Sequence, residues 1–293
     1  MLAQLLVNGL VNGCVLALMA VGFALIYNTT RIFHVAHGAV FVVGAYAYYL
    51  TSQRLLWPEP FAVGAALVAS ALCGLAIEAL AYAPLYRKQA PSTVCLLTSF
   101  GLYIAIINMV ALVFGNEVQV LRPTEGAAFE VGPILVSRVQ LLEVAVSVLA
   151  LTPVMIMLRR SDWGRLIRAV RDNPQLVTTM GVNLLSIRRL VFVIGSMLAS
   201  AAAVLSVVDV GISPQAGMPV LLMAAVAAIV GGIGTFGGAL IGSFVVAVLQ
   251  SVSVWRVSSK WSDAITFGML ILFMIFCPTG LLGRRGRVEE APD

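Results

Sequence analysis

Long blocks of apolar residues, separated by short polar stretches, dominate this sequence. A helix needs about 20 apolar residues to cross the hydrocarbon of a bilayer. Several blocks are short or rich in glycine, so the pattern predicts eight or nine membrane segments, some of them broken or re-entrant. The predicted fold is an all-α, polytopic transmembrane helix bundle that forms a single domain over residues 1–293. The blocks are residues 5–28, 36–52, 60–83, 92–114, 139–158, 190–210, 218–232, 238–254 and 264–280.

One long polar stretch, residues 159–189, interrupts this pattern. It holds seven of the sixteen arginines of the chain, and only Asp162 and Asp172 oppose them. Loops rich in Lys and Arg are retained on the cytoplasmic side of a membrane. The sequence therefore predicts a cytoplasmic loop, and its arginines are Arg159, Arg160, Arg165, Arg168, Arg171, Arg188 and Arg189.

The loop carries the signals of two short helices. Either Ser161 or Asp162 can cap the first helix, and three apolar positions follow at a spacing of three to four residues. These apolar positions are Leu166, Ile167 and Val170. A short, capped and basic helix in the cytoplasm is expected to bind a partner protein.

The second loop helix is predicted to start at Asn173, with Pro174 at its first position, and to stop at Gly181 with a positive φ. So short a helix is marginal alone in water. We expect a partner surface to cover Leu176 and Met180, which lie four residues apart on one face. The residues expected to form this docking loop are Gly164, Arg165, Arg168, Arg171, Asn173, Pro174, Leu176, Met180 and Gly181, with Arg165, Arg168 and Arg171 near the membrane surface or facing acidic groups of the partner.

The other charged residues extend the predicted topology. Residues 84–91 and 281–293 contain clustered basic residues and are expected inside with the loop. The segment 115–138 has balanced charges and is expected outside, where Pro123, Gly126, Gly132 and Pro133 should break regular structure. Arg256 and Lys260 fall outside in this count, which indicates that one segment near 218–254 does not cross fully.

Two glycine-rich places stand about 200 residues apart, in corresponding parts of the two halves of the chain. Small residues at this spacing let helices approach closely. Paired interrupted helices favour an internal repeat whose broken helices line a pathway. The alternative is that glycine is simply common in membrane helices. The residues expected along the pathway are His37, Gly38 and Gly44 at the first place, and Gly231, Gly232 and Gly234 at the second.

Composition excludes several classes of function. Residues are 60% hydrophobic and 11% charged, whereas soluble domains carry about 25% charged residues. The net charge of +5 comes from arginines near membrane ends, which indicates a role in membrane topology rather than in binding nucleic acid. Neither Lys88 nor Lys260 follows a glycine, so the chain lacks the Gly-Lys-Ser/Thr sequence of a phosphate-binding loop. We expect no ATP hydrolysis by this route, no catalytic residue, no cofactor and no metal site.

Ionisable residues inside the apolar blocks are few. His34 and His37 lie three residues apart, but no nearby carboxylate or thiol joins them, so His37 is expected to be a packing or hydrogen-bonding residue. Glu78, Glu143 and Asp209 are the candidate membrane carboxylates. Glu78 lies near the predicted inner surface, which favours a structural role. A proton- or sodium-coupled carrier would usually show more acidic residues deep in its helices.

Three motifs resemble those of branched-chain amino acid ABC transporter permeases. Residues 33–39 and 44–46, FHVAHGA and GAY, resemble the family signature NFAHG…GAY, with His34 in place of the usual Asn. Residues 163–182, WGRLIRAVRDNPQLVTTMGV, resemble its cytoplasmic loop GRAxRAxxxNPxxAxxxGI. Residues 231–242, GGIGTFGGALIG, resemble its GGxGSxxGAxxGG segment. The resemblance follows the order of the family motifs and covers nearly the whole chain.

The resemblance implies the rest of an importer. Such machines contain two permease subunits, two ABC ATPase subunits that bind ATP, and a periplasmic binding protein, and they lie in the bacterial cytoplasmic (inner) membrane. The loop 159–189 would then be the coupling element on an ATPase. The implied function is a permease that forms the path for branched-chain amino acids. Urea or short amides are an alternative solute, because sister permeases carry them. A self-sufficient secondary transporter is a further alternative, although a carrier needs no docking loop.

Overall fold

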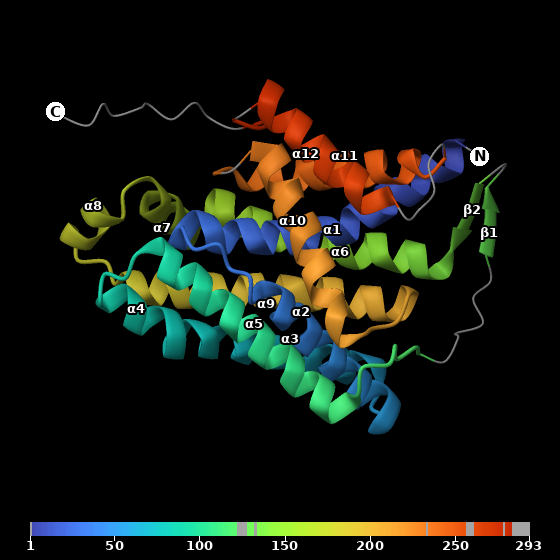
Figure 1. The fold of residues 1–293 in the computed structure, drawn as a ribbon, viewed down its shortest axis with the longest axis horizontal. Coiled ribbons are helices and arrows are strands. Elements are labelled where there is room, and N and C mark those ends of the chain that lie inside the picture. The colour runs from blue at the N-terminus through green and yellow to red at the C-terminus, as the bar shows by residue number, and fades with distance from the viewer. Residues whose placement is uncertain are drawn as a thin grey trace.

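The computed structural model describes residues 2–121, 128–131, 134–232, 234–255, 261–277 and 279–282. Nearly all of its regular structure is helical (Figure 1). The elements are α1 (Leu2–Thr30), α2 (His37–Tyr49), α3 (Glu59–Ile77), α4 (Ala83–Arg87), α5 (Ser92–Phe114), β1 (Ala128–Val131), β2 (Ile134–Ser137), α6 (Arg138–Arg160), α7 (Asp162–Asp172), α8 (Pro174–Thr179), α9 (Leu184–Asp209), α10 (Gly217–Gly232), α11 (Phe236–Ser253) and α12 (Ser262–Phe276).

Within the described ranges, seven helices are long and apolar enough to cross a membrane, so the predicted polytopic helix bundle is confirmed. The two remaining predicted segments fall on shorter helices. One is α2, which continues as a π-helix over Leu50–Arg54, and the other is α12. The seven long helices are Leu2–Thr30, Glu59–Arg87, Ser92–Phe114, Arg138–Arg160, Leu184–Asp209, Pro214–Gly232 and Phe236–Ser253.

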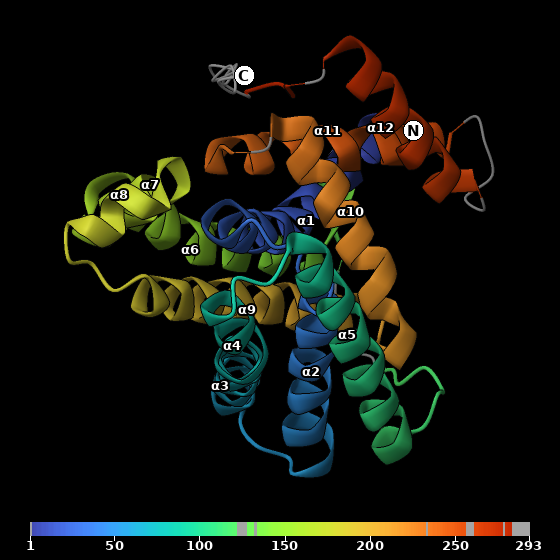
Figure 2. The same ribbon diagram turned by 60° about the vertical axis from the view of Figure 1, so that its left-hand side comes forward.

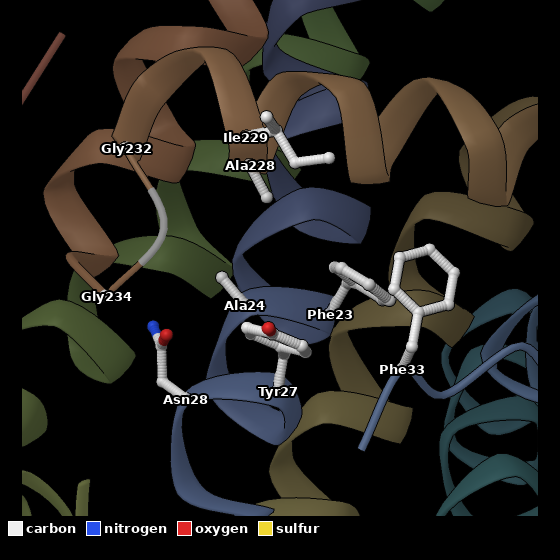
Figure 3. A pocket seen from close by; sticks show the side chains of 9 residues that line it. All are labelled: Phe23, Ala24, Tyr27, Asn28, Phe33, Ala228, Ile229, Gly232 and Gly234. Atoms are coloured by element: carbon white, nitrogen blue, oxygen red, sulfur yellow. The ribbon is translucent and has the colours of Figure 1, made fainter. Parts of the chain in front are cut away.

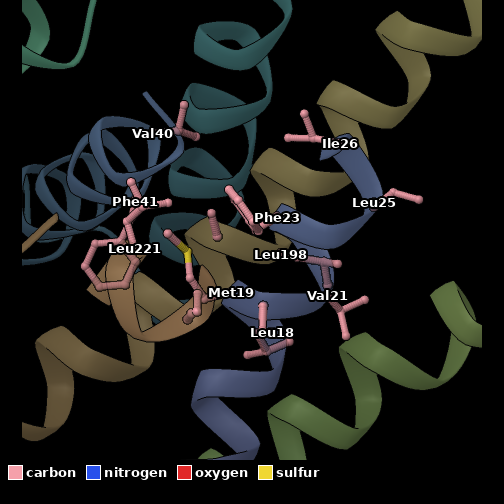
Figure 4. Close-up of a cluster of buried hydrophobic side chains, with 14 of the residues drawn as sticks. Leu18, Met19, Val21, Phe23, Leu25, Ile26, Val40, Phe41, Leu198 and Leu221 are labelled. Carbon is pink, nitrogen blue, oxygen red and sulfur yellow. The ribbon is translucent and has the colours of Figure 1, made fainter. Parts of the chain in front are cut away.

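Helices α1 and α9 form the centre of the bundle (Figure 2). In each of these two helices, 72% of the residues in the most apolar 18-residue stretch are buried within the chain, whereas in α5 the share is 17%. A helix that is apolar on every side, as α1 is, belongs in such an interior. Figure 4 shows Leu18 and Met19 of α1 beside Leu198 of α9 and Leu221 of α10. This core fixes the positions of the helix ends that meet near the loop.

A short β-hairpin departs from the all-α prediction. Strands β1 and β2 pair antiparallel, with Phe129 opposite Val136. The sequence pattern predicts no strand in the segment 115–138, so these two strands are an addition to the predicted fold. The two strands contain no proline or glycine, so nothing in them opposes an extended ladder. The four residues expected to break structure, Pro123, Gly126, Gly132 and Pro133, lie outside the described residues.

The segments that were predicted inside and the segment that was predicted outside lie at opposite ends of the bundle. Helices α4, α7 and α8 gather at one end, and β1 and β2 lie at the opposite end (Figure 1). The connection between α6 and α9 is shorter than the predicted loop 159–189, because Arg159 and Arg160 belong to α6 and Arg188 to α9. Arg256, Lys260 and residues 284–293 lie outside the described part of the chain.

Candidate functional site

The first glycine-rich place is a true helix break. Helix α1 ends at Thr30, the chain turns through residues 31–36, and α2 begins at His37. The His34 and His37 side chains are fully buried, and Nδ1 of His34 lies 2.9 Å from the hydroxyl of Tyr82. The His37 ring packs 6.3 Å from the ring of Phe23. His37 is thus a packing residue at the break, as expected. The described residues contain no cluster of three or more metal-ligating side chains.

Gly38 lets the start of α2 touch α10 backbone to backbone. A Cβ atom at Gly38 would lie 2.6 Å from the carbonyl oxygen of Gly217. Gly44, further along α2, is enclosed in the same way between Ser70 of α3 and Ser200 of α9, each with its hydroxyl 2.6 Å from an added Cβ. Real Cβ atoms do not approach other atoms so closely. The absence of a side chain at Gly38 and Gly44 therefore allows α3, α9 and α10 to pack tightly against α2.

We expect Gly38→Ala to reduce transport and thermal stability, because the added methyl group must push α2 away from the Gly217 backbone. Overpacking of this kind typically costs about 1–3 kcal/mol. The matched control is Gly64→Ala in α3, where an added Cβ meets nothing within 4 Å. Uptake and melting temperature of the two variants would be compared. Equal behaviour of Gly38→Ala and Gly64→Ala would show that the close contact is unimportant.

The second glycine-rich place is a sharp turn between α10 and α11. Gly232 and Gly234 have φ values of +112° and +102°, which L-residues with a side chain rarely adopt. Gly231 contacts the backbone of Gly238 so closely that no side chain fits between the two helices. The chain after α12 also reaches this turn, because its amides at 281 and 282 donate to the carbonyls of residues 230 and 231 at 2.9 and 3.0 Å.

The structure brings the two breaks together at one pocket of about 110 Å³ (Figure 3). Phe33 comes from the first break, and Gly232 and Gly234 come from the second. His37, Gly38, Gly44 and Gly231, although predicted for the same site, do not line it. The full lining consists of Phe23, Ala24, Tyr27, Asn28, Phe33, Ala228, Ile229, Gly232 and Gly234.

Asn28 is a buried polar residue in the lining of this pocket. Its side chain is 1% exposed, and neither its amide nitrogen nor its oxygen has a hydrogen-bond partner among the described residues. In Figure 3 the amide points toward the turn that carries Gly234. A buried amide without partners is costly unless a group enters to satisfy it. The pocket therefore offers aromatic walls, the amide of Asn28 and the hydroxyl-bearing side chain of Tyr27. Sequence reasoning missed Asn28, which is a polar residue at the end of an apolar block.

The docking loop folds locally as predicted. The hydroxyl of Ser161 accepts a hydrogen bond from the amide of Gly164 at 3.1 Å, so Ser161 rather than Asp162 caps α7. Asn173 caps α8 by accepting from the amide of Leu176 at 2.9 Å. Pro174 is the first residue of α8, and Gly181 follows the helix with a φ of +81°. Each of these roles follows from the backbone groups that helix ends leave unpaired.

Helix α7 lies against the bundle, and two of its arginines donate to backbone carbonyls of the same chain. Arg168 donates to the carbonyl of Leu158, and Arg171 donates to the carbonyl of Gly234 at 2.6 Å. These two side chains therefore reach backbone groups of the same chain, whereas Arg165 is exposed and pairs with Asp162. That the three arginines lie near the membrane surface or face acidic groups of a partner stays a prediction. A helical wheel of α7 cannot show which carbonyls lie beneath it, because Leu158 belongs to the preceding helix and Gly234 to the turn between α10 and α11.

Helix α8 presents apolar side chains to the outside. Leu176 is 58% exposed and Met180, just beyond the helix end, is 75% exposed, whereas Val177 is buried. Trp163 at the start of α7 is 48% exposed. Exposed apolar side chains gathered on one surface are typical of sites that contact another protein or a membrane. Docking of a partner on Leu176 and Met180 stays a prediction.

A buried ion pair joins α9 to the long helix that contains α3 and α4. Arg188 donates from Nε and Nη2 to the two oxygens of Glu78 at 2.7 and 3.2 Å, and its guanidinium lies 4.8 Å from the centre of the Tyr86 ring. The side chains of Arg188 and Glu78 are 5% and 0% exposed. Glu78 is structural, as predicted. Arg188 is not a loop residue, because α9 begins at Leu184, four residues before it.

Comparison with known proteins identifies the family. The family described as branched-chain amino acid transport system / permease component matches residues 5–274. The chain belongs to this permease family. It is 31% identical to the high-affinity branched-chain amino acid transport system permease protein BraD of Pseudomonas aeruginosa, over 96% of this chain and 95% of that protein. It is 30% identical to the permease protein LivH of Escherichia coli strain K12, again over 96% and 95% of the two chains.

A more distant relative and one solved structure extend the comparison. The probable branched-chain amino acid transport permease protein LivH of Methanocaldococcus jannaschii is 24% identical over 97% of this chain and 91% of its own. The structure of PsaBC from Streptococcus pneumoniae in complex with Fab aligns with a TM-score of 0.53 and 14% identity over 93% of this chain and 91% of that chain. At this identity the PsaBC match shows a shared fold.

In this member of the permease family, we expect Gly181→Val to loosen the end of α8. The position has a φ of +81°, and an added Cβ would meet nothing within 4 Å, so the cost is conformational rather than steric. A β-branched residue in this conformation costs about 1 kcal/mol or more. Hydrogen exchange of the α8 amides should become faster in Gly181→Val and change less in Gly181→Asn, because Asn tolerates positive φ better. Unchanged exchange in Gly181→Val would contradict this account.

Proposed function

We propose that this permease forms the translocation path for branched-chain amino acids in an ATP-binding-cassette importer of the bacterial cytoplasmic membrane. The proposed partners are two ABC ATPase subunits, a second permease subunit and a periplasmic substrate-binding protein. ATP would be bound by the ATPase subunits, and the permease itself would hold neither a cofactor nor a metal. The bilayer is its environment, and it has no role in binding nucleic acid.

The observation that carries this proposal is the exposed apolar end of α8. Leu176 and Met180 project from a helix that is capped at its start by Asn173 and stopped at Gly181. In the loop 159–189, helix α7 packs against the bundle and helix α8 projects from it. The loop can therefore serve as a coupling element through α8. The full-length similarity to BraD and LivH, whose names state branched-chain amino acid transport, supports the solute class.

The finer architecture is part of the same proposal. All residues 1–293 would form one transmembrane domain with eight or nine crossings, in which α2 and α12 add to the seven long helices. An internal repeat would relate the two halves, and its broken helices would line the path. Support for the repeat comes from the pocket of Figure 3, where the two glycine-rich breaks meet. Helices α4, α7 and α8 would lie on the cytoplasmic side and the β-hairpin on the outer side.

Solute competition tests the proposed solute. The complete importer, reconstituted in liposomes with its binding protein, is expected to take up labelled leucine, and isoleucine and valine should compete. Urea and short amides in excess should leave leucine uptake unchanged. Uptake of urea without uptake of leucine would contradict this proposal and would assign the alternative solute, urea or short amides, to this permease.

A further inference from the structure

Arg171 lies at the last turn of α7 and makes an unusual set of contacts. Its side chain is 16% exposed. Its Nη1 atom donates to the carbonyl oxygen of Gly234 at 2.6 Å, while Nε and Nη2 lie 2.8 and 2.7 Å from Oδ1 of Asp172. The guanidinium group thus spans from the loop to the turn between α10 and α11. A planar group with several fixed donors suits this bridging role better than a single ammonium group.

The backbone of Arg171 is also held from the other break. Nη2 of Arg31 donates to the carbonyl oxygen of Arg171 at 3.3 Å. Arg31 directly follows α1 and has a φ of +57°, so it begins the turn that leads to α2. The last turn of α7 is therefore bonded to both helix breaks, through one side chain and one carbonyl.

The rest of α7 is suited to pass on a displacement. Ile167 and Val170 are buried under it, and Arg168 is bonded to the last turns of α6 through the carbonyl of Leu158. These contacts hold α7 to the core and to the last turn of α6. The turn that Arg171 holds contains Gly232 and Gly234, both at positive φ, and such glycine turns can absorb large changes of backbone angle.

We propose that Arg171 is a positioning residue that ties the docking loop to the turn between α10 and α11, so that movement imposed on α8 by an ATPase shifts this turn and the pocket that it lines. This inference rests on the proposed function. The ATPase would bind the exposed face of α8, and Arg171 would act behind it without touching the ATPase. Gly234 is both the acceptor of Arg171 and a wall of the pocket that holds Asn28.

Distances in the wild-type complex test this link directly. Spin labels would be placed at the exposed positions Gln175 in α8, Ile241 in α11 and Leu80 in the long helix, after the native cysteines have been replaced. When a non-hydrolysable ATP analogue binds the assembled importer, the distance from Gln175 to Ile241 should stay constant. The distances from Leu80 to both positions should change together. If the distance from Leu80 to Gln175 changes while that from Leu80 to Ile241 does not, the link is refuted. It is also refuted if neither distance changes.

Substitutions test the role of the side chain. Arg171→Met keeps the unbranched stem and removes every donor. We expect it to retain ATPase subunits while uptake per ATP hydrolysed falls about tenfold or more, since a charge-assisted hydrogen bond is lost. The distribution of Gln175 to Ile241 distances should broaden. Arg171→Lys should recover part of both properties. Arg87→Met removes an exposed arginine at the same end of the bundle, in α4, and should match the wild type in both.

The outcomes separate this inference from the proposed function. Wild-type coupling and a narrow distance distribution in Arg171→Met would refute the role of Arg171 and leave the importer intact. Absence of ATP-dependent uptake in the wild-type complex would refute the proposed function itself. If Arg171→Met does not assemble, the wild-type distance measurements decide alone, because they require no change at Arg171.

Discussion

Leu176→Asp is expected to abolish binding of the ATPase subunits while the permease remains folded in the membrane. Leu176 is 58% exposed in the isolated chain, so a carboxylate there meets water and leaves the core of the permease untouched. In the assembled importer, the same carboxylate would be enclosed without a partner. An uncompensated buried charge typically costs about 3–5 kcal/mol, which corresponds to a loss of binding by more than two orders of magnitude.

Co-purification of the ATPase subunits from detergent measures this effect, and stimulation of ATP hydrolysis by loaded binding protein gives a second readout. The matched control is Gln175→Asp, which adds the same charge at a neighbouring exposed position of α8, off the face shared by Leu176 and Met180. The control should retain the ATPase subunits. Wild-type binding and transport in Leu176→Asp would remove α8 from the coupling mechanism.

Arg188→Met is expected to have the largest effect on stability. It leaves the carboxylate of Glu78, which is 0% exposed, buried without its cationic partner. Removing one member of a buried ion pair typically costs about 3–5 kcal/mol. We expect a large drop in the melting temperature of the purified protein, or loss of the protein from the membrane fraction.

The double variant Glu78→Met with Arg188→Met separates the ion pair from packing. Replacing both partners by apolar residues removes the unpaired charge, and such replacements are often neutral or stabilising. The double variant should therefore recover most of the stability that Arg188→Met loses. Arg165→Met, which breaks the exposed pair with Asp162, should leave the melting temperature unchanged. Equal instability of the single and double Arg188 variants would assign the loss to packing instead.

The local structure of this permease follows largely from its sequence. Helix α5 occupies Ser92–Phe114, the range predicted from an uninterrupted apolar block. The cap at Asn173 and the positive φ at Gly181 were also predictable, because each depends on neighbours within four residues. For the first loop helix the sequence left Ser161 and Asp162 open as caps, and the structure shows Ser161. The hairpin was missed because each strand has only four residues, too few for an alternating pattern to stand out.

Contacts between distant segments were not predictable from one sequence. Arg188 and Glu78 are 110 residues apart, and nothing in their local patterns indicates that they pair. The partners of Arg168 and Arg171 are backbone carbonyls, which leave no trace in the sequence. Periodicity places these arginines on a helix but cannot say whether they face a partner or their own bundle. The same limit applies to Asn28, whose pocket exists only because two breaks meet.

ATP dependence of uptake tests the central claim most directly. The permease would be reconstituted in liposomes alone, with the second permease subunit, and with the complete set of ATPase and binding proteins. We expect leucine uptake only from the complete set, and only with ATP inside the compartment where the ATPases lie. Rapid uptake by the purified permease alone, unaffected by ATPase subunits or ATP, would contradict the claim that this chain is the passive, externally driven part of an importer.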